Sequence, residues 1–451
     1  MCRRPVAKLV EPILPDYVGT MLGSPVRSYV VMASLGLVSF AACANSQSNA
    51  APQSSGAAGT SALAGASNGG AGAGAGAGTA GTQHAGGGGH SGGDSDVGVY
   101  AGAAGLADAA GAGGEAGASN SDEYEGCRYA GSETGAYLRI LDALDGFPGS
   151  TNPLGVSADG STIVGGSAGK DGSQHAVIWR PDGSLKDLFQ ATNGLLVQAY
   201  FASCDGKLTL AHAYGARYRH SESNGDVQVP GCGADLPALG VEGMDESGTV
   251  LVGECQSADA QHTYVRRWQG SQGPLPIDAF EGYGLAVSGD GLVFAGVRED
   301  GSSRRVFRWT EANGTETLFD TVSGTISMSA DGSTIVAQGG DSAGGYVRWR
   351  NGVETPVPCD TQNTYCFPTL VSGNGRTLLI TVDSEIMVWR DDEPLRPLRD
   401  VLAEAGVDLS PWASFVVTAW TPDKRVLVGV LQKTSPADQV PFYLVLPKGT
   451  L

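Results

Sequence analysis

Residues 156–164 read VSADGSTIV, and residues 328–336 read MSADGSTIV. Eight letters, from Ser157 and from Ser329 onward, are identical, and the two copies start 172 positions apart. Weaker copies stand between and after them. Aligned on the turn glycine or its equivalent, the seven copies are centred on Gly160, Gly206, Gly248, Gly291, Gly332, Gly375 and Lys424. Successive copies are 41 to 49 residues apart, and 172 is four steps of 43, so the chain repeats one unit of about 43 residues.

Each unit also carries an aromatic residue in an alternating apolar stretch after the turn. These residues are Trp179, Tyr218, Trp268, Trp309, Trp349, Trp389 and Tyr443. Alternation of apolar and polar residues is typical of β-strands, and the Asp-Gly dipeptide supplies the positive φ angles of a tight hairpin. Each unit therefore reads as strand, Asp-Gly hairpin, strand, loop, aromatic strand, turn and fourth strand.

Seven units of four strands predict an all-β fold, a seven-bladed β-propeller of four-stranded blades at residues 127–451. The last unit, which ends in PFYLVLPKGTL, lacks its fourth strand. Residues 136–146, AYLRILDALDG, precede the first unit and resemble such a strand. We expect them to complete the seventh blade, which would close the ring and remove an open sheet edge. Only residues 398–409 have a helix-like pattern.

Residues 1–43 are interpreted as a secretion signal whose true start is Met21, with a basic residue, an apolar run and a small-residue ending. The apolar run is shorter than the ~20 residues that cross a bilayer. The ending resembles a bacterial lipoprotein signal, which implies that Cys43 is lipidated. Cleavage after Ala44, which would discard this cysteine, is the alternative. Residues 44–126 are mostly Gly, Ala and Ser and predict a disordered linker.

Export makes disulfides possible for the six cysteines of residues 127–451. Cys359 and Cys366 flank a short polar loop and are the expected pair, whereas the pairing of the other four stays open. His is scarce and no CxxC spacing occurs, so neither a metal site nor a cofactor is predicted. The formal net charge of −19, without a basic stripe, argues against nucleic acid and against anionic lipid as partners.

Residues that recur at the same position of the repeat are interpreted as serving the fold and not a ligand. The repeated aromatic residues are expected to pack blade against blade. The turn acids Asp159, Asp205, Asp290 and Asp331 are explained by backbone hydrogen bonds in the hairpin. Arginines that directly precede an aromatic residue are expected to pair with acidic residues inside the fold: Arg217, Arg267, Arg308 and Arg348.

The segment GVSADGSTIVGGS, followed by HAVIWRPDGSLKDL, resembles the HAF repeat of exported bacterial proteins and is similar to the PDG propeller repeats of the TolB type. The resemblance covers about residues 155–446. It implies an exported, extracellular repeat protein and carries over no catalytic residue.

The sequence therefore favours a non-catalytic scaffold, anchored by lipid at the outer membrane or cell surface or alternatively secreted, that binds a surface protein or glycan as a monomer. The expected recognition loops are residues 168–174, 255–263 and 297–304, because they differ most between units. Trp412 and Trp420 lie outside the repeated aromatic register and are the candidate ligand contacts.

Two other functions stay open. An envelope lyase or hydrolase would need a base and a charge stabiliser on one face, for which His212, His220 and Tyr214 are available, but no catalytic residue is predicted. A purely structural envelope role is the third.

Overall fold

The computed structural model describes ten stretches of the chain, with gaps between them. They are residues 126–129, 131–144, 150–191, 197–233, 240–259, 261–340, 345–359, 366–391, 393–434 and 439–451. The predicted secretion signal, Cys43 and the linker up to residue 125 lie outside the described residues.

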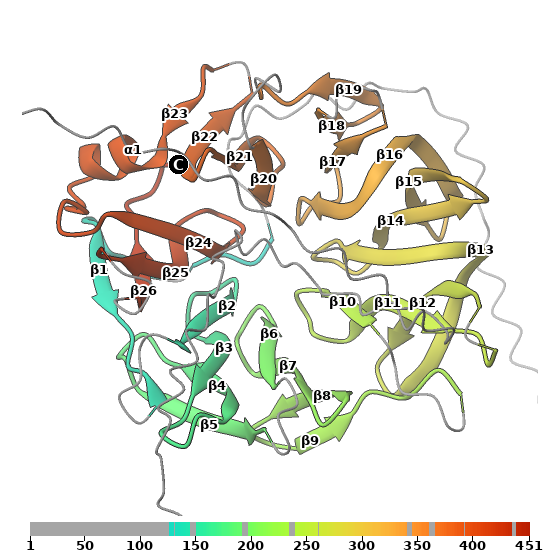
Figure 1. Ribbon diagram of the computed structural model, residues 1–451, viewed down its shortest axis with the longest axis horizontal. Helices are drawn as coiled ribbons and strands as arrows, with labels where there is room; N and C mark the ends of the chain where they lie inside the picture. Colours follow the sequence, from blue (N-terminus) through green and yellow to red (C-terminus); the bar gives the residue numbers. More distant parts are fainter. Residues whose placement is uncertain are drawn as a thin grey trace, which may run out of the picture. The chain divides into compact units, whose positions relative to one another are not determined.

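Twenty-six strands build the described part, and all of them belong to antiparallel sheets arranged around a common centre (Figure 1). Two four-stranded sheets come first in the chain. The first contains β2 (Asn152–Val156), β3 (Ile163–Ala168), β4 (Gln174–Trp179) and β5 (Leu185–Gln190). The second contains β6 (Gln198–Ala202), β7 (Leu208–Ala213), β8 (Ala216–Ser221) and β9 (Gly225–Gln228).

A ten-stranded sheet follows, because two long strands each belong to two groups. Its strands are β10 (Gly240–Met244), β11 (Val250–Gln256), β12 (Thr263–Gln269), β13 (Gln272–Val287), β14 (Val293–Asp300), β15 (Ser303–Thr310), β16 (Gly314–Met328), β17 (Thr334–Gly339), β18 (Tyr346–Arg350) and β19 (Val353–Pro356). The first part of β13 pairs with β12, and its last six residues pair with β14. β16 passes from β15 to β17 in the same way.

The last two sheets complete the arrangement. One contains β20 (Cys366–Val371), β21 (Thr377–Val382), β22 (Glu385–Arg390) and β23 (Arg396–Pro397). The other contains β24 (Ser414–Trp420), β25 (Val426–Gln432), β26 (Gln439–Val445) and β1 (Tyr137–Ile140). The pairing of β1 with β26 confirms that the segment before the first unit supplies the strand that the last unit lacks.

The helix-like pattern is confirmed only in its first part, as α1 (Leu398–Glu404). Gly406 follows with a φ of +84°, a left-handed conformation that ends helices. Leu398, Val401 and Leu402 are buried in the core between the last two sheets. Among the described residues, no helix is long and apolar enough to cross a membrane.

The core lies between neighbouring sheets. Trp268 is fully buried against Leu210 and Leu251 of two adjacent sheets, and its indole N–H donates to the carbonyl of Pro230 at 2.9 Å. Trp179 packs in the same way against the last sheet and donates to the carbonyl of Asp142 at 2.7 Å. The aromatic landmarks are thus sheet-to-sheet packing elements, as predicted, although Tyr218 is only partly buried.

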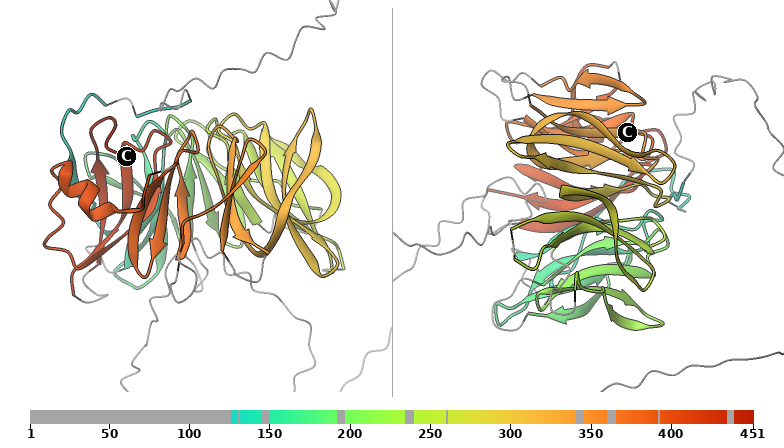
Figure 2. Two further views of the ribbon diagram at one scale, coloured as in Figure 1. Left: turned by 90° about the horizontal axis from the view of Figure 1, so that it is seen from above. Right: turned by 90° about the vertical axis from the view of Figure 1, so that its right-hand side faces the viewer.

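The strands run between two opposite faces of the arrangement, which the side views of Figure 2 separate. The Asp-Gly hairpins between first and second strands lie in a row, linked by backbone hydrogen bonds of 2.6–3.0 Å such as those from Asp159 to Cys204 and from Cys204 to Glu246. We call this side the turn face. Connections between second and third strands leave the opposite ends of the same strands, and we call that side the loop face.

Candidate binding face

The repeated SxDG motif is a self-contained hydrogen-bonded turn. In the first copy, the carboxylate of Asp159 accepts from the Ser157 hydroxyl at 2.7 Å and from the Ser161 N–H at 2.9 Å, and the Ser157 hydroxyl accepts from the Thr162 N–H. The same bonds recur around Asp331. The structure therefore confirms that the turn acids serve the hairpin.

The arginines before the aromatic residues connect neighbouring sheets. Arg267 lies 5.2 Å from the ring centre of Trp309 in the next unit, and Arg348 lies 4.3 Å from that of Trp389. Arg348 also forms an ion pair with Asp391 at 2.9 Å. Arg217, Arg267 and Arg308 lie 3.8–4.0 Å from the carboxylates of Glu242, Glu311 and Glu316, so the expected pairing within the chain is close only at Arg348.

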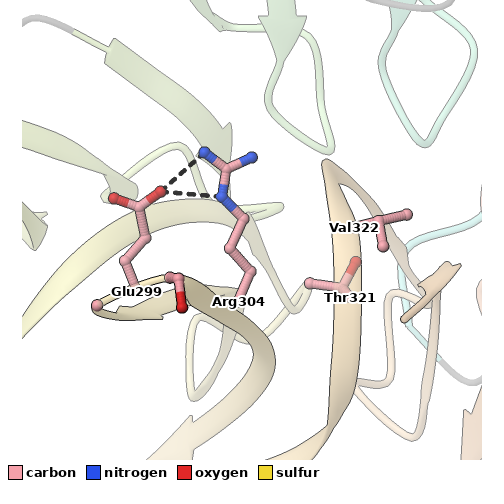
Figure 3. A pocket seen from close by; sticks show the side chains of 6 residues that line it. Glu299, Arg304, Thr321 and Val322 are labelled. Atoms are coloured by element: carbon pink, nitrogen blue, oxygen red, sulfur yellow. Dashed lines mark hydrogen bonds and ion pairs between the residues drawn. The ribbon is translucent and has the colours of Figure 1, made fainter. Parts of the chain in front are cut away.

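The three loops expected to recognise a ligand all lie on the loop face, because each joins the second and third strands of its unit. One of them, residues 297–304, forms a wall of a hollow of about 470 Å³ (Figure 3). Glu299 and Arg304 stand on this wall, and Thr321 and Val322 of β16 stand on the other. Val322 is 52% exposed, whereas Thr321 is buried and its hydroxyl donates to the carbonyl of Gln338 at 2.6 Å, so the hollow combines charged and apolar surface.

An ion pair fixes the charged wall of this hollow. Glu299 Oε1 accepts from Arg304 Nε and Nη2, both at 3.0 Å, and from the Tyr283 hydroxyl at 3.2 Å. Both charged side chains keep access to water, with 24% of Glu299 and 38% of Arg304 exposed. Such a pair can offer donors and acceptors to a ligand without first ordering long side chains.

Three partly buried carboxyl groups lie near one another beside this wall. Burial raises the pKa of Glu254 to about 7, helped by the negative charges of Glu242 and Glu299. Burial also raises the pKa of Glu242, against the influence of Arg217, whose guanidinium lies 3.9 Å away. A side chain at Gly240 would meet both Glu242 and Glu254 at about 3 Å, so glycine leaves room for the two groups.

The residues named for an enzyme are not brought together. His212 pairs in register with Arg217 near the β7–β8 turn, whereas His220 lies three positions further along the same strand pair. His220 Nδ1 bonds Asp226 at 2.6 Å, and Tyr214 is 46% exposed at the turn. Burial, together with the charge of Arg217, lowers the pKa of His212 to about 4, so this imidazole is neutral at neutral pH.

A hydrogen-bonded Ser-His-Asp chain was not foreseen from the sequence. His175 Nε2 lies 2.9 Å from the Ser173 hydroxyl and its Nδ1 lies 2.8 Å from Asp187. The same hydroxyl donates to Asp171 at 2.5 Å. The donor and acceptor in the contact between Ser173 and His175 depend on the imidazole tautomer, and the chain ties the β3–β4 turn to His175 of β4 and Asp187 of β5.

The candidate ligand-contact tryptophans lie at opposite ends of β24 in the last sheet, Trp412 just before its first residue and Trp420 at its last. Trp420 is 8% exposed, and its N–H donates to the carbonyl of Val371 at 3.2 Å. Trp412 is partly exposed against the same core, with Lys433 Nζ 5.4 Å from its ring centre. Of the two, only Trp412 offers appreciable surface to a ligand.

All six cysteines of the described stretches are paired in disulfides. Cys359 bonds Cys366, as predicted, and the two pairings left open are Cys127 with Cys204 and Cys232 with Cys255. Within the described stretches, no group of three or more His, Cys, Asp and Glu side chains is placed to hold a metal ion.

No protein-family model and no curated protein matches this sequence. It is similar in structure to a protein assigned as TolB from Agrobacterium tumefaciens, at 15% identity and a TM-score of 0.39, covering 58% of this chain and 94% of that one. It is also similar to TolB from Acinetobacter baumannii, at 13% identity and a TM-score of 0.36, covering 64% of this chain and 65% of that one. A hydrazine synthase chain from Kuenenia stuttgartiensis is similar at 13% identity and a TM-score of 0.39, covering 67% of this chain and 97% of that one. The description of this chain as an all-β propeller rests on its own strand pairing, and the HAF resemblance stays a prediction.

Proposed function

We propose that the protein is exported and lipid-anchored through Cys43, and that it is a non-catalytic scaffold that binds a protein or glycan at the cell surface. Counting β13 and β16 twice, once in each of their two groups, gives seven blades of four strands. The rigid ring holds the loop face as the binding surface. The turn face serves the fold, since its repeated polar groups bond one another.

The observation that carries this proposal is the hollow formed by the loop 297–304. This loop was singled out because its sequence departs from the other units, and it lines about 470 Å³ of space with Glu299 and Arg304. Pockets of this size, with a few placed polar groups, suit one small ligand or one anchoring segment of a larger partner.

Affinity capture tests the proposal. The full-length oxidised protein, immobilised, would be exposed to envelope and culture-medium fractions of the native organism, with unfolded protein as the control. We expect a retained protein or polysaccharide whose binding is lost at least tenfold in the double variant Glu299→Ala, Arg304→Ala. The matched control is Arg396→Ala, Glu404→Ala, an exposed pair of the same type away from the hollow. Equal retention by both variants would place the binding elsewhere and overturn the proposal.

An envelope hydrolase or lyase is the second candidate, favoured by the raised pKa of Glu254. A partly buried carboxyl group with a pKa of about 7 suits general acid–base chemistry near neutral pH. Its test is release of sugar or peptide fragments from purified envelope material. Loss of this release in Glu254→Gln, with capture unchanged, would favour the enzyme over the scaffold.

A further inference from the structure

A short segment ahead of β1 lies against the turn face and contacts several sheets. It comprises residues 126–129 and 131–133, and we call it the strap. Cys127 is bonded to Cys204 in the β6–β7 turn, and its N–H donates to Glu246 Oε2 in the β10–β11 turn at 3.2 Å. The beginning of the strap is therefore attached to two neighbouring turns.

The middle of the strap reaches the first and last sheets. The Tyr129 N–H donates to Asp423 Oδ2 in the β24–β25 turn at 3.0 Å. The Tyr129 ring covers Gly160 of the β2–β3 turn so closely that a Cβ there would lie 2.5 Å from the ring. Arg425 stacks on this ring at 5.1 Å, and it donates to the carbonyls of Gly131 at 3.2 Å and Glu133 at 3.0 Å.

These contacts cross the boundary where the ring closes. The first and last sheets are joined there by side-chain packing, which includes Trp179 and Tyr443, and by the hydrogen bond from the Thr418 hydroxyl to the carbonyl of Pro153. The β1 segment also spans this boundary, because β1 pairs with β26 of the last sheet and Arg139 of β1 donates to the carbonyl of Pro181 in the first sheet. The strap spans it and is covalently fixed at its far end.

We propose that the strap is a disulfide-locked clasp across the closure of the ring, and that an external dithiol releases it. The dithiol would supply two electrons and two protons, so that the bond between Cys127 and Cys204 breaks and two thiols form while the dithiol becomes a disulfide. Release leaves the chain attached to the sheets at β1 instead of Cys127. About ten residues are then freed, which can extend over roughly 30 Å.

The clasp also fixes where the chain joins the folded sheets. In the oxidised protein this place is on the turn face, at Cys127, on the opposite side of the sheets from the hollow. The loop face is therefore left uncovered by the strap. This inference is independent of the proposed binding role, because it rests on contacts that do not involve the hollow.

Hydrogen exchange of the full-length protein tests the clasp. We would compare the oxidised parent, the same protein after brief treatment with dithiothreitol, and the variant Cys127→Ser. The matched control is Cys232→Ser, Cys255→Ser, which removes another disulfide and leaves the strap attached. We expect exchange in the strap and in the β2–β3 and β24–β25 turns to rise at least tenfold without the Cys127 bond, and to stay within twofold in the control.

Two outcomes would overturn the proposal. Slow exchange in the strap after loss of the disulfide would mean that the noncovalent contacts hold it alone. Equal acceleration in the control would mean that any lost disulfide loosens the whole ring. Dithiothreitol treatment of the folded parent covers the case in which Cys127→Ser does not fold. Tyr129→Ala, with the disulfide intact, should accelerate the β24–β25 turn but leave Cys127 bonded to Cys204.

Discussion

Replacing Gly332 by alanine should destabilise the protein much more than the same replacement at Gly352. Both glycines have a positive φ, +67° and +84°, a region in which a Cβ is unfavourable. They differ in their surroundings. A Cβ on Gly332 would lie 2.8 and 2.9 Å from two atoms of Val293 in the preceding unit, whereas nothing lies within 4 Å of one on Gly352.

The expected magnitudes follow from these two terms. The backbone term costs roughly 1–2 kcal/mol at either position. At Gly332 the added methyl group also overpacks a contact between two neighbouring units, which costs about 1–3 kcal/mol more. Val293 cannot relieve this contact easily, because a β-branched side chain has few χ1 alternatives. We therefore expect a loss of about 2–5 kcal/mol for Gly332→Ala and about 1–2 kcal/mol for Gly352→Ala.

Urea unfolding followed by tryptophan fluorescence, on the oxidised full-length protein, measures both free energies. The parent and the two variants should have the same slope against urea, so that the midpoints report stability. Equal losses at the two glycines would refute the inference that the turn of one unit packs tightly against the unit before it. A loss below about 0.5 kcal/mol at both would refute the backbone term as well.

Four further changes have defined outcomes. Lys424→Gly should stabilise the protein by about 0.5–1 kcal/mol in urea unfolding, since Lys424 has a φ of +63° where the other units have glycine. Trp268→Ala should cost about 3–5 kcal/mol by the same assay, with Trp268→Phe costing less. Glu254→Gln should remove a fall in stability that occurs as pH rises from about 4.5 to 7. The folded state holds the Glu254 proton up to about pH 7, whereas the unfolded chain loses it near the ordinary value of 4.5, so unfolding midpoints of the variant should change less between pH 5 and 8. Serine at both Cys359 and Cys366 should cost about 2 kcal/mol, because their loop is short, and a melting temperature within error of the parent would contradict this.

The repeat made much of the fold predictable, because its determinants are local. An Asp-Gly hairpin needs only its own backbone angles and its own side-chain bonds, and Ser329, Asp331 and Gly332 supply both within four residues. The strand before the first unit was also predictable, since the count of strands leaves the last unit one short. Even Lys424, which lacks the glycine signature, was placed correctly by the spacing, and it adopts the same left-handed conformation.

The candidate site was only partly predictable, because its members come from different units. The loop 297–304 could be chosen for its unusual sequence, but its opposite wall, Thr321 and Val322, belongs to a strand that passes between two groups. Glu242 and Glu254 lie on the paired strands of one hairpin, whereas Glu299 comes from the next unit, so its approach to them depends on how neighbouring units stack. The pairing of Cys127 with Cys204 was open for the same reason.

Pseudo-symmetry itself indicates why a ligand should be sought on the loop face. Near the turn, each unit repeats the same chemistry, because the hydrogen bonds and the packing between sheets require it. Six residues after the turn glycine or its equivalent, the hairpin bonds and the packing no longer require one residue type, and the units differ. The residues at this position are Gly166, His212, Glu254, Val297, Gln338, Thr381 and Val430. A ligand that binds at one place on a ring of similar units must recognise what distinguishes one unit from the next. Two acidic residues distinguish neighbouring units here: Glu254, six residues after Gly248, and Glu299, eight residues after Gly291 of the next unit. The charge of Glu299 is close enough to help raise the pKa of Glu254.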